Sequence, residues 1–563
     1  MHGDLVIKNG KIFGKESTAV AIEDTRIVKV GSDSEIDPYI KKSTKVIDAE
    51  GKTVIPTFVD AHMHPSMAAS LCAGLTMYHV IRQDDESRED YIARMMEVLK
   101  DYVTNNQERD IIIGYGWYPE AFTTYEKGRP TRHDIDKVCA DKPVVLRSFD
   151  AHAMLVNSKA LELAGIDKNT PDPRGGMFGR ADDGTPNGNV YEFTAMEVIF
   201  DNLEGADFTV EGYEEGILYF QENVALPNGV TTVFDALIRP NAIKAFHNLA
   251  KDGRLKIKVS SAWVSDPAKP EDQFDEMIKN KGIYDVADKF YIKTVKFFID
   301  GGAFGFLTNE PFEAELLKMN GLPEDYCGES LWTPDELNSA FLKLSKAGYQ
   351  IHVHCMGDGA VAHTLDAFEY VYNQGVKGNR NVITHIMNIT DRDIERMKKL
   401  DVIAAMQPSW PIVDSFLRYG VIPLFGEKRA YEQYPLGRLH DAGIMVTSST
   451  DYPVTENINP LRGIQCSMTR SMPKSNPEYE QFKGIVSGLP DNLTRDCMSL
   501  PDLMDSYTLN GAYQLFAEDQ IGSIEEGKNA NILILDQNIS NADVMEIENI
   551  KIKNLIVEGD IIK

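Results

Sequence analysis

The feature that most restricts the fold is a series of eight apolar, β-branched runs, most of them separated by amphipathic stretches of helical period. The runs cover residues 53–60, 230–236, 257–264, 291–300, 349–354, 381–385, 402–407 and 444–449. Residues 334–347 and 391–400 are examples of the helical stretches. Runs without polar alternation are typical of strands buried on both faces of a parallel sheet. Eight such strands with helical crossovers predict an α/β fold, a (β/α)8 TIM barrel.

The barrel does not account for the whole chain of 563 residues. The first and second runs are too far apart for one crossover, so we expect an inserted subdomain at about residues 65–228, after barrel strand 1. This insert has strand-like pieces of its own at residues 110–114 and 143–147. We therefore predict that the barrel domain spans residues 56–516 and is interrupted by the insert.

Both ends of the chain show the short alternating patterns of β-strands. Near the start, residues 4–8 and 11–13 flank Asn9-Gly10, which predicts a hairpin because this dipeptide supplies the positive φ of a tight turn. Near the end, residues 531–536 and 550–557 are strand-like. Neither piece can bury a core alone. We expect a small β-sandwich-like domain built from residues 1–55 and 517–563, the alternative being two unrelated β appendages.

Composition argues against nucleic-acid-binding, membrane-bound and disulfide-rich proteins. The formal net charge of −28 disfavours contact with nucleic acid or with anionic membranes. The six cysteines contain no CxxC pair, which argues against a zinc knuckle or a disulfide scaffold. The first residues do not resemble a signal peptide, and no apolar run is long enough for a membrane span. We expect a cytoplasmic protein without nucleic-acid or membrane partners.

A pair of histidines ends the first apolar run. Residues two apart on a strand face the same way, so His62 and His64 project together. At the carboxyl end of a barrel strand they can share one metal ion. A single His-x-His is weak evidence, because packing explains many such pairs.

Three more strand ends carry a potential metal ligand. His354 follows His352 at the end of one run, His385 ends another, and Asp451 follows the last run. His354 is the better candidate of the first pair because it is nearer the strand end. Each residue alone could be a core or capping residue, but four strand ends with such side chains favour a metal site. Neutral imidazoles and carboxylates suit zinc, manganese or iron.

Lys296 lies in the apolar stretch Val295 to Ile299, where a cation is costly to bury. One interpretation is a lysine that reaches solvent or pairs with an acid such as Asp300. In a metal-lined barrel there is another: carbon dioxide adds to the neutral amine, and the resulting carbamate bridges two metal ions.

Long stretches of the chain resemble the amidohydrolase superfamily, specifically the branch that contains N-substituted formamide deformylases (amidohydrolase family 3-like). They are GKTVIPTFVDAHMHP, GYGWYPEAF, RPTRHDID, DAHAMLVNSKALELAGI, NGVTTVFDA, KFFIDGG, HVHCMGDGA, MQPSW, STDYPV and IGSIEEGKNANILILD. The resemblance covers nearly the whole length. It implies a barrel with a small β domain formed by both termini.

The resemblance also implies a role for each candidate. The implied metal ligands are His62, His64, Lys296 in carboxylated form, His354, His385 and Asp451. Asp451 is also implied to move the proton during hydrolysis. The departures from the family pattern are Ser449-Thr450 for Gly-Ser, Thr384 for a glutamate, and Ala530-Asn531 for Ala-Asp. None of these removes a ligand.

The implied reaction is hydrolysis of a C–N bond in an amide, N-formyl compound or cyclic amide. The implied cofactors are two divalent metal ions, zinc above all, with manganese or iron as alternatives. The other hypotheses are a one-metal deaminase of the same superfamily, with Lys296 unmodified, and a non-catalytic scaffold. We expect a small-molecule substrate, which the sequence does not identify, and allow for a homodimer. The substrate-binding candidates are His152, Trp117 and Trp410, with Tyr118 and Phe122 as further aromatic residues.

Overall fold

The computed structural model describes residues 3–68, 74–83, 86–119, 128–301, 305–489 and 493–563. Its centre is an eight-stranded parallel sheet in the order β22-β21-β20-β19-β16-β15-β14-β7. The strands are β7 (Phe58–Met63), β14 (Val230–Asp235), β15 (Lys258–Val264), β16 (Phe290–Phe298), β19 (Gln350–Cys355), β20 (Val382–His385), β21 (Ile403–Met406) and β22 (Val446–Ser448). The barrel closes beside β7, where Asp451 N–H donates to His62 O at 2.9 Å. The predicted (β/α)8 fold is confirmed.

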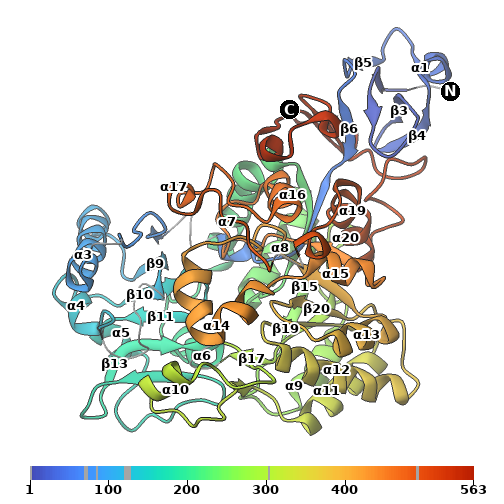
Figure 1. Cartoon of the computed structure of the whole chain (residues 1–563). Helices are drawn as coiled ribbons and strands as arrows, with labels where there is room; N and C mark the ends of the chain where they lie inside the picture. Colours follow the sequence, from blue (N-terminus) through green and yellow to red (C-terminus); the bar gives the residue numbers. More distant parts are fainter. Residues whose placement is uncertain (1–2, 69–73, 84–85, 120–127, 302–304, 490–492) are drawn as a thin grey trace.

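Amphipathic helices cover the outside of the barrel (Figure 1). They include α8 (Pro240–Lys251), α11 (Pro334–Lys346), α12 (Asp358–Asn373), α13 (Asp391–Leu400) and α15 (Leu436–Asp441). In α11, the buried face comprises Leu337, Ala340, Phe341 and Leu344 at helical spacing. This helix begins with a capping box in which Thr333 and Glu336 satisfy each other's backbone N–H groups. The predicted helices at 334–347 and 391–400 are both present.

The first predicted barrel strand, residues 53–60, is divided between two sheets. Its first part forms β6 (Thr53–Pro56) in the terminal sheet, and β7 begins at Phe58. The change occurs at Thr57, whose N–H donates to Asn531 O, whereas Phe58 N–H donates to Gly229 O. Both parts are apolar because both are buried, so composition could not reveal the boundary between them.

The two chain ends form one sheet, as predicted. Its order is β2-β6-β23-β24-β25, with β2 (Lys11–Ile12), β23 (Ile532–Leu535), β24 (Ile552–Val557) and β25 (Asp560–Ile561). A second sheet has the order β4-β3-β1-β5, with β1 (Leu5–Lys8), β3 (Ala19–Glu23), β4 (Arg26–Gly31) and β5 (Lys45–Asp48). One apolar core joins the two sheets, including Ile7, Val20, Val54, Ile532 and Ile556. In Figure 1 the first strands therefore lie near the C-terminus.

The predicted hairpin at Asn9-Gly10 is wrong. β1 pairs with β3 and β5, whereas β2 pairs with β6 in the other sheet. A type I′ turn needs positive φ at both central residues, but only Asn9, at φ 51°, has it. A Cβ atom on Gly10 would lie 2.6 Å from the Val54 side chain. Glycine is needed here because the chain passes closely between the two sheets.

The insert between β7 and β14 contains a six-stranded sheet in the order β12-β13-β11-β10-β9-β8. Its strands are β8 (Leu75–Thr76), β9 (Ile112–Trp117), β10 (Val144–Ser148), β11 (Ala153–Val156), β12 (Met177–Arg180) and β13 (Pro186–Tyr191). Its helices include α3 (Arg88–Asn105), α4 (Arg132–Asp136), α5 (Ser158–Leu163) and α6 (Glu192–Asn202). Figure 1 shows this unit beside the barrel. Among the described residues, no helix combines the length and apolar character needed to cross a membrane.

Candidate metal centre

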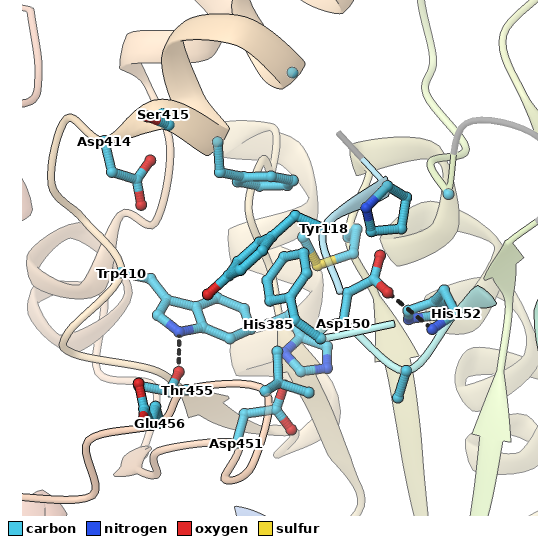
Figure 2. A pocket seen from close by; sticks show the side chains of 18 of the residues that line it. Tyr118, Asp150, His152, His385, Trp410, Asp414, Ser415, Asp451, Thr455 and Glu456 are labelled. Atoms are coloured by element: carbon cyan, nitrogen blue, oxygen red, sulfur yellow. Dashed lines mark hydrogen bonds between the residues drawn. The ribbon is translucent and has the colours of Figure 1, made fainter. Parts of the chain in front are cut away.

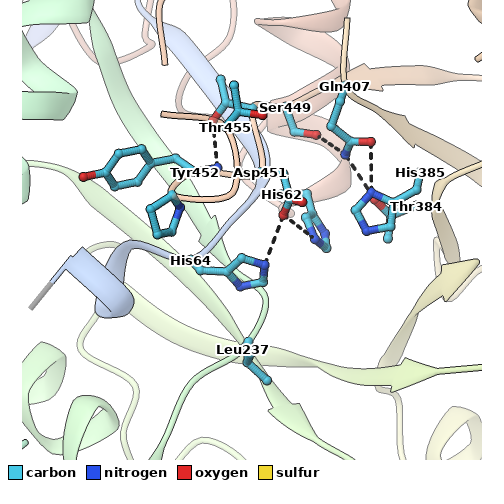
Figure 3. Close-up of polar contacts among 12 residues, drawn as sticks. His62, His64, Leu237, Thr384, His385, Gln407, Ser449, Asp451, Tyr452 and Thr455 are labelled. Carbon is cyan, nitrogen blue, oxygen red and sulfur yellow. Dashed lines mark hydrogen bonds and ion pairs between the residues drawn. The ribbon is translucent and has the colours of Figure 1, made fainter. Parts of the chain in front are cut away.

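Two histidines at the carboxyl end of β7 point into the barrel mouth together with Asp451 (Figure 3). Asp451 Oδ1 lies 3.3 Å from His62 Nε2 and 3.1 Å from His64 Nε2. All three residues are buried. Two ligands held about 2.1 Å from one tetrahedral ion lie about 3.4 Å apart. The three donors therefore have the spacing expected around a single metal ion.

The donors are in the protonation states that metal binding requires, a neutral imidazole and an ionised carboxylate. Burial, reinforced by the nearby Lys296, lowers the pKa of His62 far below its usual value, which keeps the imidazole neutral. Burial alone would raise the pKa of Asp451, but His64, His385 and Lys296 together outweigh this effect and hold the pKa below normal. His62 Nε2 and Asp451 Oδ1 are buried, and within the described part of the chain neither has a hydrogen-bond partner of good geometry. A bound cation would satisfy both atoms, so the residues present fit a metal ion.

His354 and His385 lie beside this group, with ring centres 4.7 Å apart. His354 Nδ1 contacts Asp300 Oδ1 at 3.0 Å, and His385 Nδ1 contacts Gln407 Oε1 at 3.0 Å. Because both partners are acceptors, each Nδ1 carries the hydrogen and leaves the Nε2 lone pair available. Burial also lowers the pKa of both histidines well below normal. The pair is therefore oriented for a metal at Nε2.

Asp300 is not the partner of Lys296 that we considered from the sequence. The chain leaves β16 at Phe298, and Asp300 begins the separate short strand β17 (Asp300–Gly301). There it accepts from the N–H groups of Met356, Gly357 and Leu307 in addition to its contact with His354.

Lys296 is completely buried, and its Nζ has no hydrogen-bond partner among the residues that the structure describes. The amine lies 4.8 Å from the centre of the Phe298 ring. Burial lowers the pKa of Lys296 to about 7, although Asp451 opposes this shift. A large part of the amine is therefore neutral near physiological pH, which is the form that reacts with carbon dioxide.

Two supporting contacts could not be predicted from the sequence. Asp60 accepts from Thr450 Oγ1 at 2.6 Å and from Thr450 N–H, which joins β7 to the segment after β22. His352, which we judged the weaker ligand candidate, contacts His62 Nδ1 through its Nε2 at 2.7 Å. The first contact lies where the barrel closes, and the second crosses its interior from β7 to β19, so only the three-dimensional arrangement reveals them.

A cavity of about 2470 Å³ opens above these residues (Figure 2). His152, Tyr118 and Trp410 line it. The Trp410 ring stacks on His385 at 5.4 Å, and its indole N–H donates to Thr455 Oγ1 at 2.7 Å.

Trp117 is packed elsewhere. It lies in the core of the insert, 1% exposed, where its indole N–H donates to Leu146 O at 3.0 Å. We therefore remove it from the substrate-binding candidates. Phe122 lies outside the described residues.

A family model for the amidohydrolase family matches residues 45–563. The chain belongs to this family. It is 27% identical to Protein LONG AFTER FAR-RED 3 of Arabidopsis thaliana, over 95% of this chain and 87% of that protein. It is 24% identical to an N-substituted formamide deformylase of Arthrobacter pascens, over 99% of this chain and 97% of the relative.

The fold is shared with a solved structure of an uncharacterized metal-dependent hydrolase from Pyrococcus horikoshii OT3. The TM-score is 0.71 at 23% sequence identity, and the match covers 99% of this chain and 100% of that one. The family match makes the protein a hydrolase of the amidohydrolase family. The convergent His and Asp donors give it a candidate metal site.

Proposed function

We propose that this amidohydrolase cleaves a C–N bond of an amide, an N-formyl compound or a cyclic amide by a two-metal mechanism. The observation that carries the proposal is the convergence of His62, His64 and Asp451 from opposite ends of the barrel sequence onto one point. These donors lie at the carboxyl ends of barrel strands, where barrel enzymes have their active sites.

The residues divide between two metal positions. His62, His64 and Asp451 would hold one ion, and His354 and His385 the other, with carboxylated Lys296 as the bridge. Zinc suits this set of nitrogen and carboxylate donors, and manganese or iron are alternatives. When bound, the metals would supply an activated water molecule and polarise the carbonyl group.

The protein's own side chains would transfer the proton and bind the substrate. Asp451 would accept the proton of the attacking water and deliver it to the departing nitrogen, because an amine leaves poorly without protonation. Its pKa, held below normal, makes the carboxylate available as the initial base. Trp410, fixed by Thr455, would form one wall for the substrate, and His152 would contact it from the insert.

One observation favours a second candidate, a one-metal deaminase. Among the described residues, His62, His64 and Asp451 form the single group of three converging donors. His354 and His385 lack a carboxylate ligand unless Lys296 is modified. Metal content per chain separates the two: about two ions support hydrolysis by the two-metal mechanism, and one ion with an unmodified lysine supports the deaminase. A non-catalytic scaffold would not need a complete donor set.

The test is a panel of N-acyl, N-formyl and cyclic amides presented to the metal-loaded protein. We expect turnover of at least one class, lost on metal removal and restored by adding zinc. His64→Asn should lose turnover with its melting temperature preserved, because the site lies at the barrel mouth and not in its core. His440→Asn, a partly exposed histidine on α15, is the control and should keep full activity. Full activity in protein shown to be metal-free would refute the proposal.

The proposal also covers the substrate class, cellular location and partners of the enzyme. We infer a small-molecule substrate and a cytoplasmic location, and we allow for a homodimer. The strongly acidic chain supports the absence of nucleic-acid and membrane partners.

A further inference from the structure

His152 reaches the metal centre from the insert, whereas the donor side chains come from the barrel. It lies in the loop between β10 and β11 and lines the cavity (Figure 2). The centre of its ring is 5.6 Å from that of His354. In the part of the chain that the structure describes, its Nδ1 has a protein partner and its Nε2 has none. The free nitrogen is therefore available to a ligand in the cavity.

His152 is held by three contacts, one at its ring and two at its backbone. Its Nδ1 lies 3.0 Å from Glu192 Oε2, its carbonyl accepts from Glu192 N–H at 2.8 Å, and its own N–H donates to Asp150 Oδ1 at 3.1 Å. Since Glu192 binds both the backbone and the ring of the same residue, it fixes the direction in which Nε2 points. Such a contact on the far side of a histidine sets which nitrogen it offers to a ligand.

The backbone on both sides of this contact has an uncommon conformation. Ala151 and Glu192 both have φ 65°, in the left-handed region that residues other than glycine rarely adopt. Such residues persist where surrounding contacts hold them, and they gather at functional sites. Two such residues flank the contact between His152 and Glu192, which indicates that the surrounding structure fixes the position of this pair for a function.

Glu192 packs against the short strand β17, which follows barrel strand β16. It is 5% exposed, and a Cβ atom on Gly301 would lie 3.2 Å from its Oε2. Glu192 begins α6, and the other end of this helix is fixed by Arg239, which follows β14. Arg239 contacts Glu197, lies 3.2 Å from Asp207 Oδ2 and stacks on Phe200 at 4.5 Å.

We propose that His152 contacts the substrate through Nε2 beside His354, and that Glu192 is the positioning residue that fixes its ring. The insert thus completes a site whose metal donors all belong to the barrel. The inference rests on the proposed function, because the ligand in question is the substrate cleaved at the metal centre. Burial alone would lower the pKa of His152, but Glu192 raises it to about 9, which agrees with a close pairing of the two side chains.

A histidine–carboxylate pair outside the cavity provides the comparison. His133 lies 3.7 Å from Asp136 on α4 of the same insert, and its side chain is 68% exposed. It does not line the cavity. His133→Asn is therefore the matched control for His152→Asn.

The test compares these variants in the metal-loaded full-length protein. Asparagine at position 152 keeps a donor near Nδ1 for Glu192 but removes Nε2. We expect His152→Asn to lower kcat/KM about 100-fold on an amide substrate, with metal content unchanged. Glu192→Gln keeps the acceptor and should lose about 10-fold, mainly in kcat, since the ring is held less firmly. Added imidazole should restore part of the activity of His152→Ala, which a purely structural residue would not permit.

A second measurement does not depend on turnover. Acetohydroxamate, a small amide analogue that binds metals, is titrated into wild type, His152→Asn and His133→Asn by calorimetry. We expect about 10-fold weaker binding in His152→Asn alone. Equal affinities of the three proteins, or wild-type kcat/KM in His152→Asn, would overturn the inference. If no amide is hydrolysed yet His152→Asn still binds the analogue more weakly, the proposed reaction fails while the His152 contact is supported.

Discussion

At the scale of single residues, buried polar atoms without protein partners mark the site. Lys296 Nζ is the most extreme of them, because a completely buried amine normally has an acid beside it. Its pKa, which burial lowers, and its closeness to His62, His354 and His385 both agree with a modified lysine.

Lys296→Ala should leave one metal ion per chain instead of two and should remove most of the activity. Adding propionate should restore part of it, because a short carboxylate can occupy the vacated bridge. Lys296→Arg should not help, since arginine keeps its charge and cannot form the carbamate. Metal analysis and an intact-protein mass spectrum under native conditions give the readouts. Two metals in the alanine variant, without added carboxylate, would contradict the bridge.

Lys258 provides a prediction on stability that is independent of the metal. It lies in β15, 6% exposed, with its Nζ 2.5 Å from Gln520 Oε1. Burial lowers its pKa in the folded protein from 10.5 to about 8. Below pH 8 the lysine is charged in both states, so its burial costs the folded state about 3 kcal/mol. This cost is relieved as the pH rises from 8 towards 10.5.

Lys258→Met should therefore raise the free energy of unfolding at pH 7 and remove its increase between pH 8 and 10.5. Denaturant unfolding across that range measures both effects. Lys244→Met, at an exposed position on α8, is the control and should change neither. A variant less stable than wild type at pH 7 would show that the bond to Gln520 matters more than burial of the charge.

The sequence shows the donor residues but not their supports. His62, His64, His354, His385 and Asp451 could be predicted because each ends an apolar strand, and a barrel brings such ends together. Asp300 and Gln407, the partners of His354 and His385, come from other strands, and no local spacing connects them. Asp60 lies on β7 with His62, but its partner Thr450 is far away in the sequence. Glu192, the partner of His152, comes from the insert. Trp117 was misplaced because an aromatic side chain has the same appearance in a core and in a pocket.

At the scale of elements, the barrel is closed by a contact between its first and last strands. Asp60 on β7 accepts both the hydroxyl and the backbone N–H of Thr450, immediately after β22. The contact also holds Asp451, the next residue, which has φ 60°. Closure of the barrel and placement of the metal ligand are thus one structural feature.

Thr450→Val should lower the free energy of unfolding by about 2 kcal/mol, because a buried carboxylate loses one of its hydrogen bonds. Thr450→Ser keeps the hydroxyl and should behave like wild type. Urea unfolding of both variants measures the stability of the closed barrel. The zinc affinity of both variants shows whether the same contact places Asp451. Equal stability of the valine and serine variants would show that the backbone contact alone closes the barrel.

Strands were easier to predict than the connections between them. The eight barrel strands follow from their apolar runs because burial on both faces leaves a continuous pattern. The division of residues 53–60 and the path through Asn9-Gly10 depend on which distant strand is available as a partner. These are long-range pairings, and the local sequence does not contain them.

At the scale of the whole molecule, the two ends of the chain depend on each other. β6 pairs with β23, and Thr53 Oγ1 bonds to Asn538 across a separation of 485 residues. The sheet then leads directly into β7, which carries His62.

Deleting residues 518–563 should destabilise the N-terminal strands and lower the melting temperature, since β6 loses its partner and the shared core is exposed. Hydrogen exchange should show the loss first in β2 and β6. Leu533→Asp, at a buried position of β23, should produce a milder form of the same effect. Unchanged melting of the truncated protein would mean that the terminal sheets fold independently.

The shared sheet has a consequence for the protein during its synthesis. The ribosome completes β6 early, but its partner β23 is made only after almost the whole barrel. At about 5–20 residues per second this takes roughly half a minute to a minute and a half. Throughout that time the nascent chain presents an apolar strand edge that can pair with other chains. Synthesis of β23 is therefore the step that covers this edge of β6. A chain ended before β23 by a premature stop codon would leave the edge exposed to aggregation or to the proteases that remove incomplete chains.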